Sequence, residues 1–250
     1  MGARDNAVGN RRGRRWVKRV GATEAWTGTA DCRLCAIRGS VLFAGLKEDD
    51  FERFHRPIDQ SVYGAGATIY AMGDPATSLF TIRSGLVKLT QFLPDGTQRI
   101  VRLLRSTDLI GLEALIDSEY PHTATALQPT ELCRLPVEFV RSLSHSNAQL
   151  FNELMARWHK ALSNADRWIT EFSTGSSRDR VVRLLLWLAE ARGDERCELF
   201  SREDLGAVLG LTTETASRTM AELKRQGFIS EPRVNQFLCD MPSLRRLLDA

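Results

Sequence analysis

The segment SREDLGAVLGLTTETASRTMAELKRQG, residues 201–227, decides the architecture of the C-terminal part of the chain. Ser201 and Asp204 offer an N-cap pair for a short helix that stops at Gly210, and either of two adjacent threonines can cap the next helix. The second helix is amphipathic and is closed by Gly227. Two short helices joined by such a turn are typical of a helix-turn-helix.

The second helix of this unit carries the side chains that predict its chemistry. Its inward face is apolar, formed by Leu211, Ala216, Met220 and Leu223. Its first turns leave an outward set that can enter a major groove: Thr213, Glu214, Ser217 and Arg218. An arginine can donate to both acceptors of guanine, a carboxylate can accept from cytosine N4, and serine is permissive. Three further residues can hold phosphates: Lys224, Arg225 and Arg233.

A solvated, charged helix face is the alternative interpretation, because glutamate and arginine four positions apart also form ordinary intrahelical pairs. The following text favours the DNA-binding interpretation, since residues 227–229 and 235–238 resemble the two strands of a wing. We therefore predict a winged helix-turn-helix that binds double-stranded DNA.

Residues 61–136 are β-rich and predict a small antiparallel barrel or double sheet. Short apolar strands begin at Thr68, Leu79, Leu86 and Ile100. Two turns punctuate them: Pro94-Asp95-Gly96 supplies a tight hairpin, and Arg83-Ser84-Gly85 is expected to close another. No helix of any length is expected here.

Residues 147–172 change the period to steps of three and four, which predicts one long helix with a single apolar stripe. The stripe can pack on the chain's own barrel, but pairing with a second copy is favoured because the spacing resembles a coiled-coil seam. A hinge at residues 173–177 and another amphipathic helix over residues 178–192 follow. The expected homodimer interface consists of Leu150, Leu154, Trp158, Ala161, Leu162, Ala165, Trp168, Ile169 and Phe172.

Composition places the protein in the cytoplasm. Basic residues crowd the first twenty positions, but no apolar stretch follows them, so no export signal is expected. No run approaches the roughly 18 apolar residues of a membrane span. The five cysteines are then expected to be reduced.

The landmarks taken together resemble the CRP/FNR family of bacterial regulators over nearly all of the chain after Cys32. They are residues 78–85, Asp95-Gly96, residues 108–111 and the helix that carries Glu214-Thr-Ala-Ser-Arg218. The resemblance implies an α+β protein: a cyclic-nucleotide-binding-like jelly roll, a long dimerisation helix and a winged helix-turn-helix. The expected divisions are a basic disordered tail (1–30), the jelly-roll sensor (31–145), the dimerisation helix (146–174) and the DNA-binding domain (175–250).

The resemblance also separates branches of the family. Cyclic-AMP binders carry Gly-Glu-Leu and then Arg-Ser in the phosphate cassette, whereas this chain reads Gly111-Leu112-Glu113 and His122-Thr123. Without the arginine that neutralises the phosphate, cyclic AMP is not the expected ligand. The Glu-x-x-Ser-Arg pattern resembles the FNR branch, which implies a palindrome close to TTGAT-N4-ATCAA, with half-sites about 34 Å apart and RNA polymerase as a partner.

The cysteines leave two readings open. FNR-type oxygen sensors hold a [4Fe-4S] cluster with four cysteines, and Cys32, Cys35 and Cys133 match three of them. The third N-terminal position reads Val41, so a fourth donor such as Asp31 or His55 would be needed. In the other reading these cysteines are small packing residues, as we expect for Cys197 and Cys239, and the regulator answers to thiol oxidation, abundance or another ligand.

A further departure concerns the dimerisation helix. FNR-type switches place an acid on this helix, and the matching position reads Ala165, with Asp166 beside it. The dimer is therefore expected to persist without a cofactor.

Two other classes of function fit the sequence less well. An enzyme is not expected, because the four histidines lie apart from any nucleophile motif and no phosphate-binding glycine loop is present. A cyclic-nucleotide-type regulatory subunit of a partner enzyme would leave the helix-turn-helix without a role.

Overall fold

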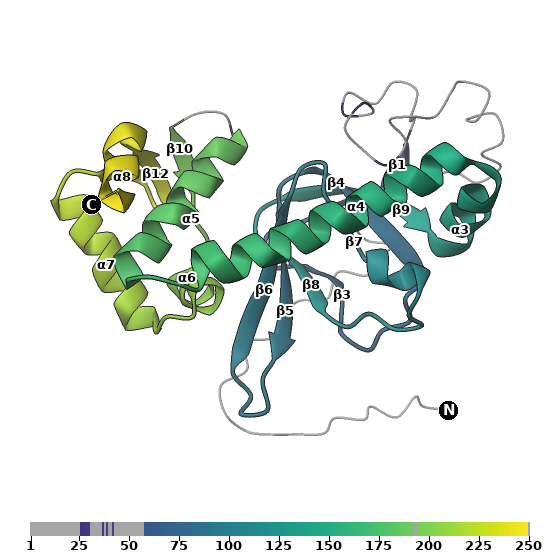
Figure 1. The fold of residues 1–250 in the computed structure, drawn as a ribbon, viewed down its shortest axis with the longest axis horizontal. Coiled ribbons are helices and arrows are strands. Elements are labelled where there is room, and N and C mark those ends of the chain that lie inside the picture. The colour runs from purple at the N-terminus through teal and green to yellow at the C-terminus, as the bar shows by residue number, and fades with distance from the viewer. Residues whose placement is uncertain are drawn as a thin grey trace, which may run out of the picture.

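The computed structural model describes residues 26–30, 37, 39, 42, 58–192 and 195–249. These residues form a double-sheeted N-terminal domain, a long helix and a C-terminal α/β domain (Figure 1). We call the N-terminal domain the sensor domain and the C-terminal domain the reader domain. The predicted α+β class and its order of parts are confirmed.

The sensor domain consists of two antiparallel sheets that pack face to face. One sheet has the order β1-β2-β9-β4-β7 and the other β3-β8-β5-β6. The strands of the first are β1 (Trp26–Ala30), β2 (Ile58–Tyr63), β9 (Thr130–Pro136), β4 (Ser78–Ser84) and β7 (Leu109–Ile110). Those of the second are β3 (Thr68–Tyr70), β8 (Thr123–Ala126), β5 (Leu86–Phe92) and β6 (Gln98–Arg105), and a 3-10 turn, η2 (Leu112–Leu115), follows β7.

The two predicted turns differ in what they join. Gly96, with φ +81°, closes the β5–β6 hairpin as expected, and its N–H donates to the Leu93 carbonyl. Gly85 also has a positive φ, but strands β4 and β5 belong to different sheets. The expectation of a second hairpin is therefore wrong: this turn carries the chain from one sheet to the other.

Two elements were not anticipated. Residues 26–30, expected to be part of a disordered tail, form strand β1, which pairs with β2 through Ala30 and Ile58. Helix α3 (Val137–Ser146) follows β9 directly and buries Val137, Val140 and Leu143 at steps of three.

Helix α4 (Ala148–Arg167) runs along the sensor domain toward the reader domain (Figure 1). The Asn147 side chain caps it by accepting from the Leu150 N–H, and a π-helical turn, η3 (Trp168–Phe172), ends it. The predicted hinge follows, with Gly175 at φ +85°. No helix in the described part of the chain is long and apolar enough to cross a membrane.

The reader domain contains four helices and a three-stranded sheet. The helices are α5 (Ser177–Arg192), α6 (Arg202–Leu209), α7 (Thr213–Arg225) and α8 (Met241–Leu248). The sheet has the order β10-β12-β11, formed by β10 (Arg196–Glu198), β12 (Gln236–Cys239) and β11 (Ile229–Arg233). Its core extends beyond the domain, because three residues of the sensor hairpin, Leu86, Ile100 and Leu103, belong to the same apolar cluster.

Candidate nucleic-acid interface

Helices α6 and α7 form the predicted helix-turn-helix. The Ser201 hydroxyl caps α6 by accepting from the Asp204 N–H at 3.0 Å, and α6 ends at Gly210 in the left-handed region, with φ +64°. The Thr212 hydroxyl caps α7 by accepting from the Thr215 N–H at 3.2 Å. Of the two threonines that could cap α7, Thr212 is therefore the one in place.

Gly206 fixes how closely the turn approaches α6. A Cβ at this position would lie 2.6 Å from the Leu211 carbonyl oxygen, and the Leu211 N–H donates to the Gly206 carbonyl at 2.9 Å. Any side chain here would therefore push the turn away from α6. Gly206 was not predicted as a functional residue, although an isolated glycine inside a helix often has a packing reason.

One face of α7 is buried and the opposite face is open. Ala216, Met220 and Leu223 are buried in the reader core, and Leu211 packs against it. Thr213, Glu214, Ser217 and Arg218 are all exposed, and we call these four residues the reading face. The structure brings them together over the first two turns of α7, where a recognition helix contacts base edges.

The basic residues beyond the reading face are held by acidic neighbours. The Lys224 ammonium donates to the Glu231 carboxylate at 2.6 Å, and Arg225 pairs with Glu222. The Lys224 interaction lowers the pKa of Glu231 below its usual range. Glu231 also accepts from the Asn235 N–H at 3.2 Å, so it links the end of α7 to the turn of the wing.

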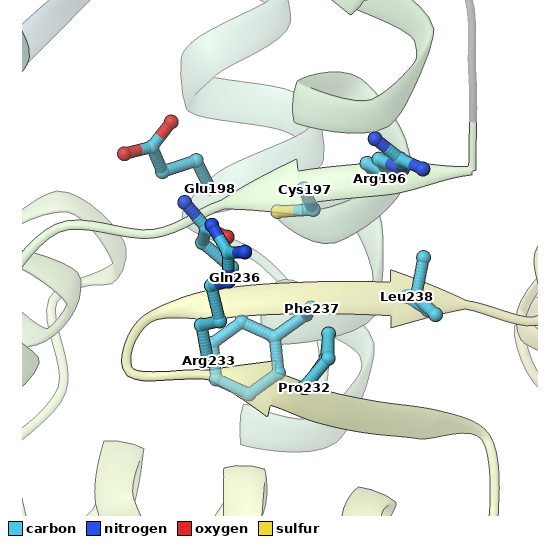
Figure 2. Close-up of a pocket in the computed structure, with 8 residues that line it drawn as sticks. All are labelled: Arg196, Cys197, Glu198, Pro232, Arg233, Gln236, Phe237 and Leu238. Carbon is cyan, nitrogen blue, oxygen red and sulfur yellow. The ribbon is translucent and has the colours of Figure 1, made fainter.

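The wing itself carries a hollow of about 460 Å³ over its three strands (Figure 2). Arg233 and Gln236 face each other across β11 and β12, and Glu198 lies near them on β10. Arg233, the third predicted phosphate contact, is exposed. Strand β10 was not predicted, because three residues carry no readable period.

Most residues of the predicted apolar stripe pack within the chain, some against the sensor core and others against the reader core. Leu150 and Leu154 are only 1% and 3% exposed and lie in the sensor core, while Phe172 is buried in the reader core. Assigning these three residues to a dimer interface is wrong, because the chain itself already covers their side chains. Trp158 and Ala161 also pack against the sensor core, and Trp168 against the reader core.

A second stripe, one residue further along, remains open. Phe151, Met155, Leu162 and Ile169 are exposed, the last two to 64% each. Together with the half-buried Trp158 and Ala165 they form a row with alternating steps of four and three, which we call the seam. This spacing is that of a coiled-coil contact. Phe151 and Met155 were not predicted as interface residues.

An ion pair occupies the cassette region of the sensor domain. Arg102 of β6 donates to Glu113 of η2 at 2.7 Å, and both side chains are largely buried. His122 lies near this pair, and burial, followed by the Arg102 charge, lowers its pKa. Arg102, the arginine of this region, is therefore already neutralised by the Glu113 carboxylate.

Of the three predicted cluster ligands, the structure describes only Cys133. Cys32 and Cys35 lie outside the described residues, as do Val41, Asp31 and His55. Cys133 lies in β9, is buried, and has Gln60 and Thr81 as its cross-strand neighbours. In the described ranges, no group of three histidine, cysteine, aspartate or glutamate side chains could hold a metal ion.

Cys197 and Cys239 are buried in the reader core, which confirms the prediction that they pack there. They lie on the neighbouring strands β10 and β12. A hydrogen bond from Cys197 lowers the pKa of the Cys239 thiol.

Comparison with known proteins gives matches in both domains. Residues 60–147 match the model of the cyclic nucleotide-binding domain family, and residues 179–247 match that of the Crp-like helix-turn-helix domain. The chain is 28% identical over 232 residues to the transcriptional regulatory protein btr of Bordetella pertussis, covering 88% of this chain and 93% of that protein. It is 27% identical over 208 residues to the transcriptional activator protein anr of Pseudomonas aeruginosa, covering 80% and 85%.

Solved structures support the same fold. The structure of FixK2 from Bradyrhizobium japonicum superposes with a TM-score of 0.69 at 24% identity, over 76% of this chain and 96% of that one. At this identity the likeness concerns the fold alone.

Proposed function

The chain belongs to the CRP/FNR family of DNA-binding transcription regulators, and from this membership we propose that it binds a palindromic operator as a homodimer. Its relatives are transcription regulators, which confirms the prediction that the protein is not an enzyme. The observation that carries the proposal is the reading face, whose four polar side chains are exposed together on a capped helix with an apolar back.

The proposed operator is TTGAT-N4-ATCAA. Arg218 donates to both acceptors of the guanine in each half-site, and Glu214 accepts from the N4 amino group of its paired cytosine. Ser217 and Thr213 complete the contact. Lys224, Arg225 and Arg233 bind phosphates, with the first two exchanging their carboxylate partners for the DNA backbone. This assignment is supported by the exposure of all seven side chains.

The proposed dimer forms through the seam. Exposed apolar side chains at heptad spacing lose contact with water when two copies of α4 pair. Ala165 lies in this row and Asp166 lies beside it, so the row itself carries no acid. We expect a dimer that persists without any cofactor. We propose that the protein acts in the cytoplasm. RNA polymerase is the proposed partner of the DNA-bound dimer.

Selection from random duplexes tests the operator without presupposing it. The purified full-length protein is incubated with a random duplex library, and bound DNA is amplified and sequenced. We expect enrichment of a palindrome whose half-sites contain TTGAT. Recovery of no motif, or of a motif without two-fold symmetry, would overturn the proposal.

A second candidate function, oxygen or nitric oxide sensing, concerns the signal. Strand β1 ends at Ala30, two residues before Cys32, and its Gly28 lies in one row with Gln60 of β2 and Cys133 of β9. Two strand spacings amount to about 10 Å. The row places the strand that leads to Cys32 in the same sheet as Cys133. On that ground we propose Cys32, Cys35 and Cys133 as ligands of a [4Fe-4S] cluster, with a fourth donor from outside the described residues. Such a cluster, when bound, supplies oxygen-sensitive redox chemistry.

The alternative is an FNR-like regulator without a cofactor, controlled by thiol oxidation, abundance or another ligand. Cyclic AMP is not the proposed effector, because Glu113 already neutralises Arg102 and the cassette reads His122-Thr123. Anaerobic purification distinguishes the two, with iron and acid-labile sulfide measured per chain before and after exposure to air. Four irons per chain with air-sensitive colour support the cluster, and iron-free protein that still binds its operator supports the alternative.

A further inference from the structure

The β5–β6 hairpin of the sensor domain is buried on both of its faces away from its turn, while residues 91–97 at the turn are exposed. Its inner face contributes Val87, Leu89 and Leu104 to the sensor core. Its outer face contributes Leu86, Ile100 and Leu103 to the core of the reader domain. Neighbouring residues of a strand point to opposite faces, so a single hairpin serves both cores.

An ion pair lies on the outer face of this hairpin. The Lys88 ammonium of β5 pairs with the Asp204 carboxylate in the first turn of α6. The two side chains are only 11% and 17% exposed. Losing either partner of a pair so shielded from water would leave the other charge buried and uncompensated. The pair therefore favours the one placement of α6 in which the two charges meet.

Two further arginines of the hairpin contact the reader domain. A Cβ added at Gly210 would lie 2.6 Å from the Arg99 guanidinium, so Arg99 rests against the turn between α6 and α7. The Arg105 guanidinium lies 4.9 Å from the ring centroid of Trp187 in α5. The hairpin therefore contacts the helix-turn-helix at two places, the start of α6 and the turn between α6 and α7.

This docked arrangement leaves the reading face open. Thr213, Glu214, Ser217 and Arg218 are exposed while Lys88 and Asp204 are paired. In Figure 1, α7 lies on the reader domain beyond α6, away from the β5–β6 hairpin. The contact therefore holds the reader domain without covering the surface that reads DNA.

We propose that Lys88 and Asp204 are positioning residues for DNA recognition, which fix the direction in which the sensor domain presents α7. The proposal rests on the proposed function. In a dimer, the two recognition helices must match two half-sites, and one added base pair rotates one half-site by about 35° relative to the other. A reader domain held by a rigid contact cannot follow that rotation, whereas a released one can.

The test is the spacing preference of the full-length protein. Dissociation constants are measured by fluorescence anisotropy for the operator recovered by selection and for versions with one base pair added to or removed from its centre. We expect the wild-type protein to favour the native spacing, and Lys88→Ala to reduce that preference roughly tenfold, within the usual range of energetic coupling between distant sites. A purely structural role would lower all affinities without changing their ratio.

Two variants serve as controls. Arg102→Ala removes an ion pair from the inner face of the same hairpin and is expected to keep the wild-type ratio. The double variant Lys88→Glu with Asp204→Lys reverses the charges and is expected to restore the preference that either single change removes. It also keeps the test decisive if Lys88→Ala does not fold.

The outcomes separate this inference from the function on which it rests. A folded Lys88→Ala protein with the wild-type ratio overturns the inference and leaves the proposed function intact. Equal loss of the ratio in Arg102→Ala also overturns it. A wild-type protein with no preference for any palindrome contradicts the proposed function together with the inference.

Discussion

Lys88 in strand β5 and Asp204 in helix α6 are 116 positions apart, yet they form an ion pair that is almost closed to solvent. The pair joins the domain that matches a cyclic nucleotide-binding fold to the helix-turn-helix. It lies beside Leu86 and Leu103, which enter the reader core from the sensor side. The two domains therefore share packing as well as a chain connection, and a change in the sensor hairpin has a direct mechanical route to α6.

The seam predicts which substitutions separate the dimer. Leu162→Glu places a charge at a position that is 64% exposed in one chain, so we expect a folded monomer by sedimentation. Leu154→Ala, only 3% exposed, should instead lower the free energy of unfolding by about 2–5 kcal/mol, because it empties space in the sensor core. Dimeric Leu162→Glu protein would show that the seam is not the interface.

Arg218 predicts a loss of base discrimination. Arg218→Ala should weaken operator binding by about 1–3 kcal/mol per half-site and remove the preference for guanine at the contacted position. Competition with operators substituted at that guanine measures both effects. Arg245→Ala, an exposed arginine of α8 that pairs with Glu190, is the matched control and should bind as the wild type does. Unchanged discrimination in Arg218→Ala would contradict the assignment.

The Lys224–Glu231 pair predicts a change in salt dependence. In Glu231→Gln the Lys224 ammonium no longer has to break an ion pair before it binds a phosphate. The slope of the logarithm of the DNA-binding constant against the logarithm of the salt concentration should therefore steepen by up to about 0.9 per protomer. Lys224→Ala should make the slope shallower by the part that Lys224 already contributes in the wild type, so that the two changes together amount to about 0.9 per protomer. Glu190→Gln removes a carboxylate from the pair with Arg245 and should leave the slope unchanged. A shallower slope in Glu231→Gln would rule out phosphate binding by Lys224.

His122 predicts a pH dependence of stability. Burial lowers its pKa below the usual histidine value of about 6.5, so the unfolded chain binds the proton more readily than the folded one. Its contribution to stability is present above pH 6.5 and is lost as the pH falls through the lowered value. Between pH 8 and pH 5, the midpoint temperature of thermal unfolding should therefore fall less steeply in His122→Gln than in the wild type. The exposed His145→Gln should follow the wild type, and identical profiles for His122→Gln would exclude this role.

The helix-turn-helix was predictable from sequence because its signals are local. Ser201 and Thr212 cap their helices, Gly210 has the left-handed conformation, and the reading face is exposed as its spacing predicts. Each of these signals depends on a few neighbouring residues and on no distant part of the chain.

The features that sequence analysis missed depend on contacts between distant segments. Two adjacent apolar stripes of α4 have the same period, so periodicity alone cannot say that Leu154 faces the sensor core and Met155 faces solvent. Likewise, Leu86 and Lys88 are unremarkable strand residues until the reader domain packs against them. Strand β1 and helix α3 are similarly stabilised by pairing and packing with remote elements.

Symmetric operator binding through α7 is tested by sedimentation of the full-length protein with matched duplexes. One duplex contains TTGAT-N4-ATCAA, and the other has the guanine–cytosine pair of each half-site exchanged for adenine–thymine. We expect two chains per duplex on the first. At physiological salt we expect binding to the second to be roughly thirtyfold to twenty-thousandfold weaker, because one mismatched base pair in each half-site costs about 1–3 kcal/mol, or about 2–6 kcal/mol for the two. Equal affinity for both duplexes, or one chain per duplex, would contradict the account.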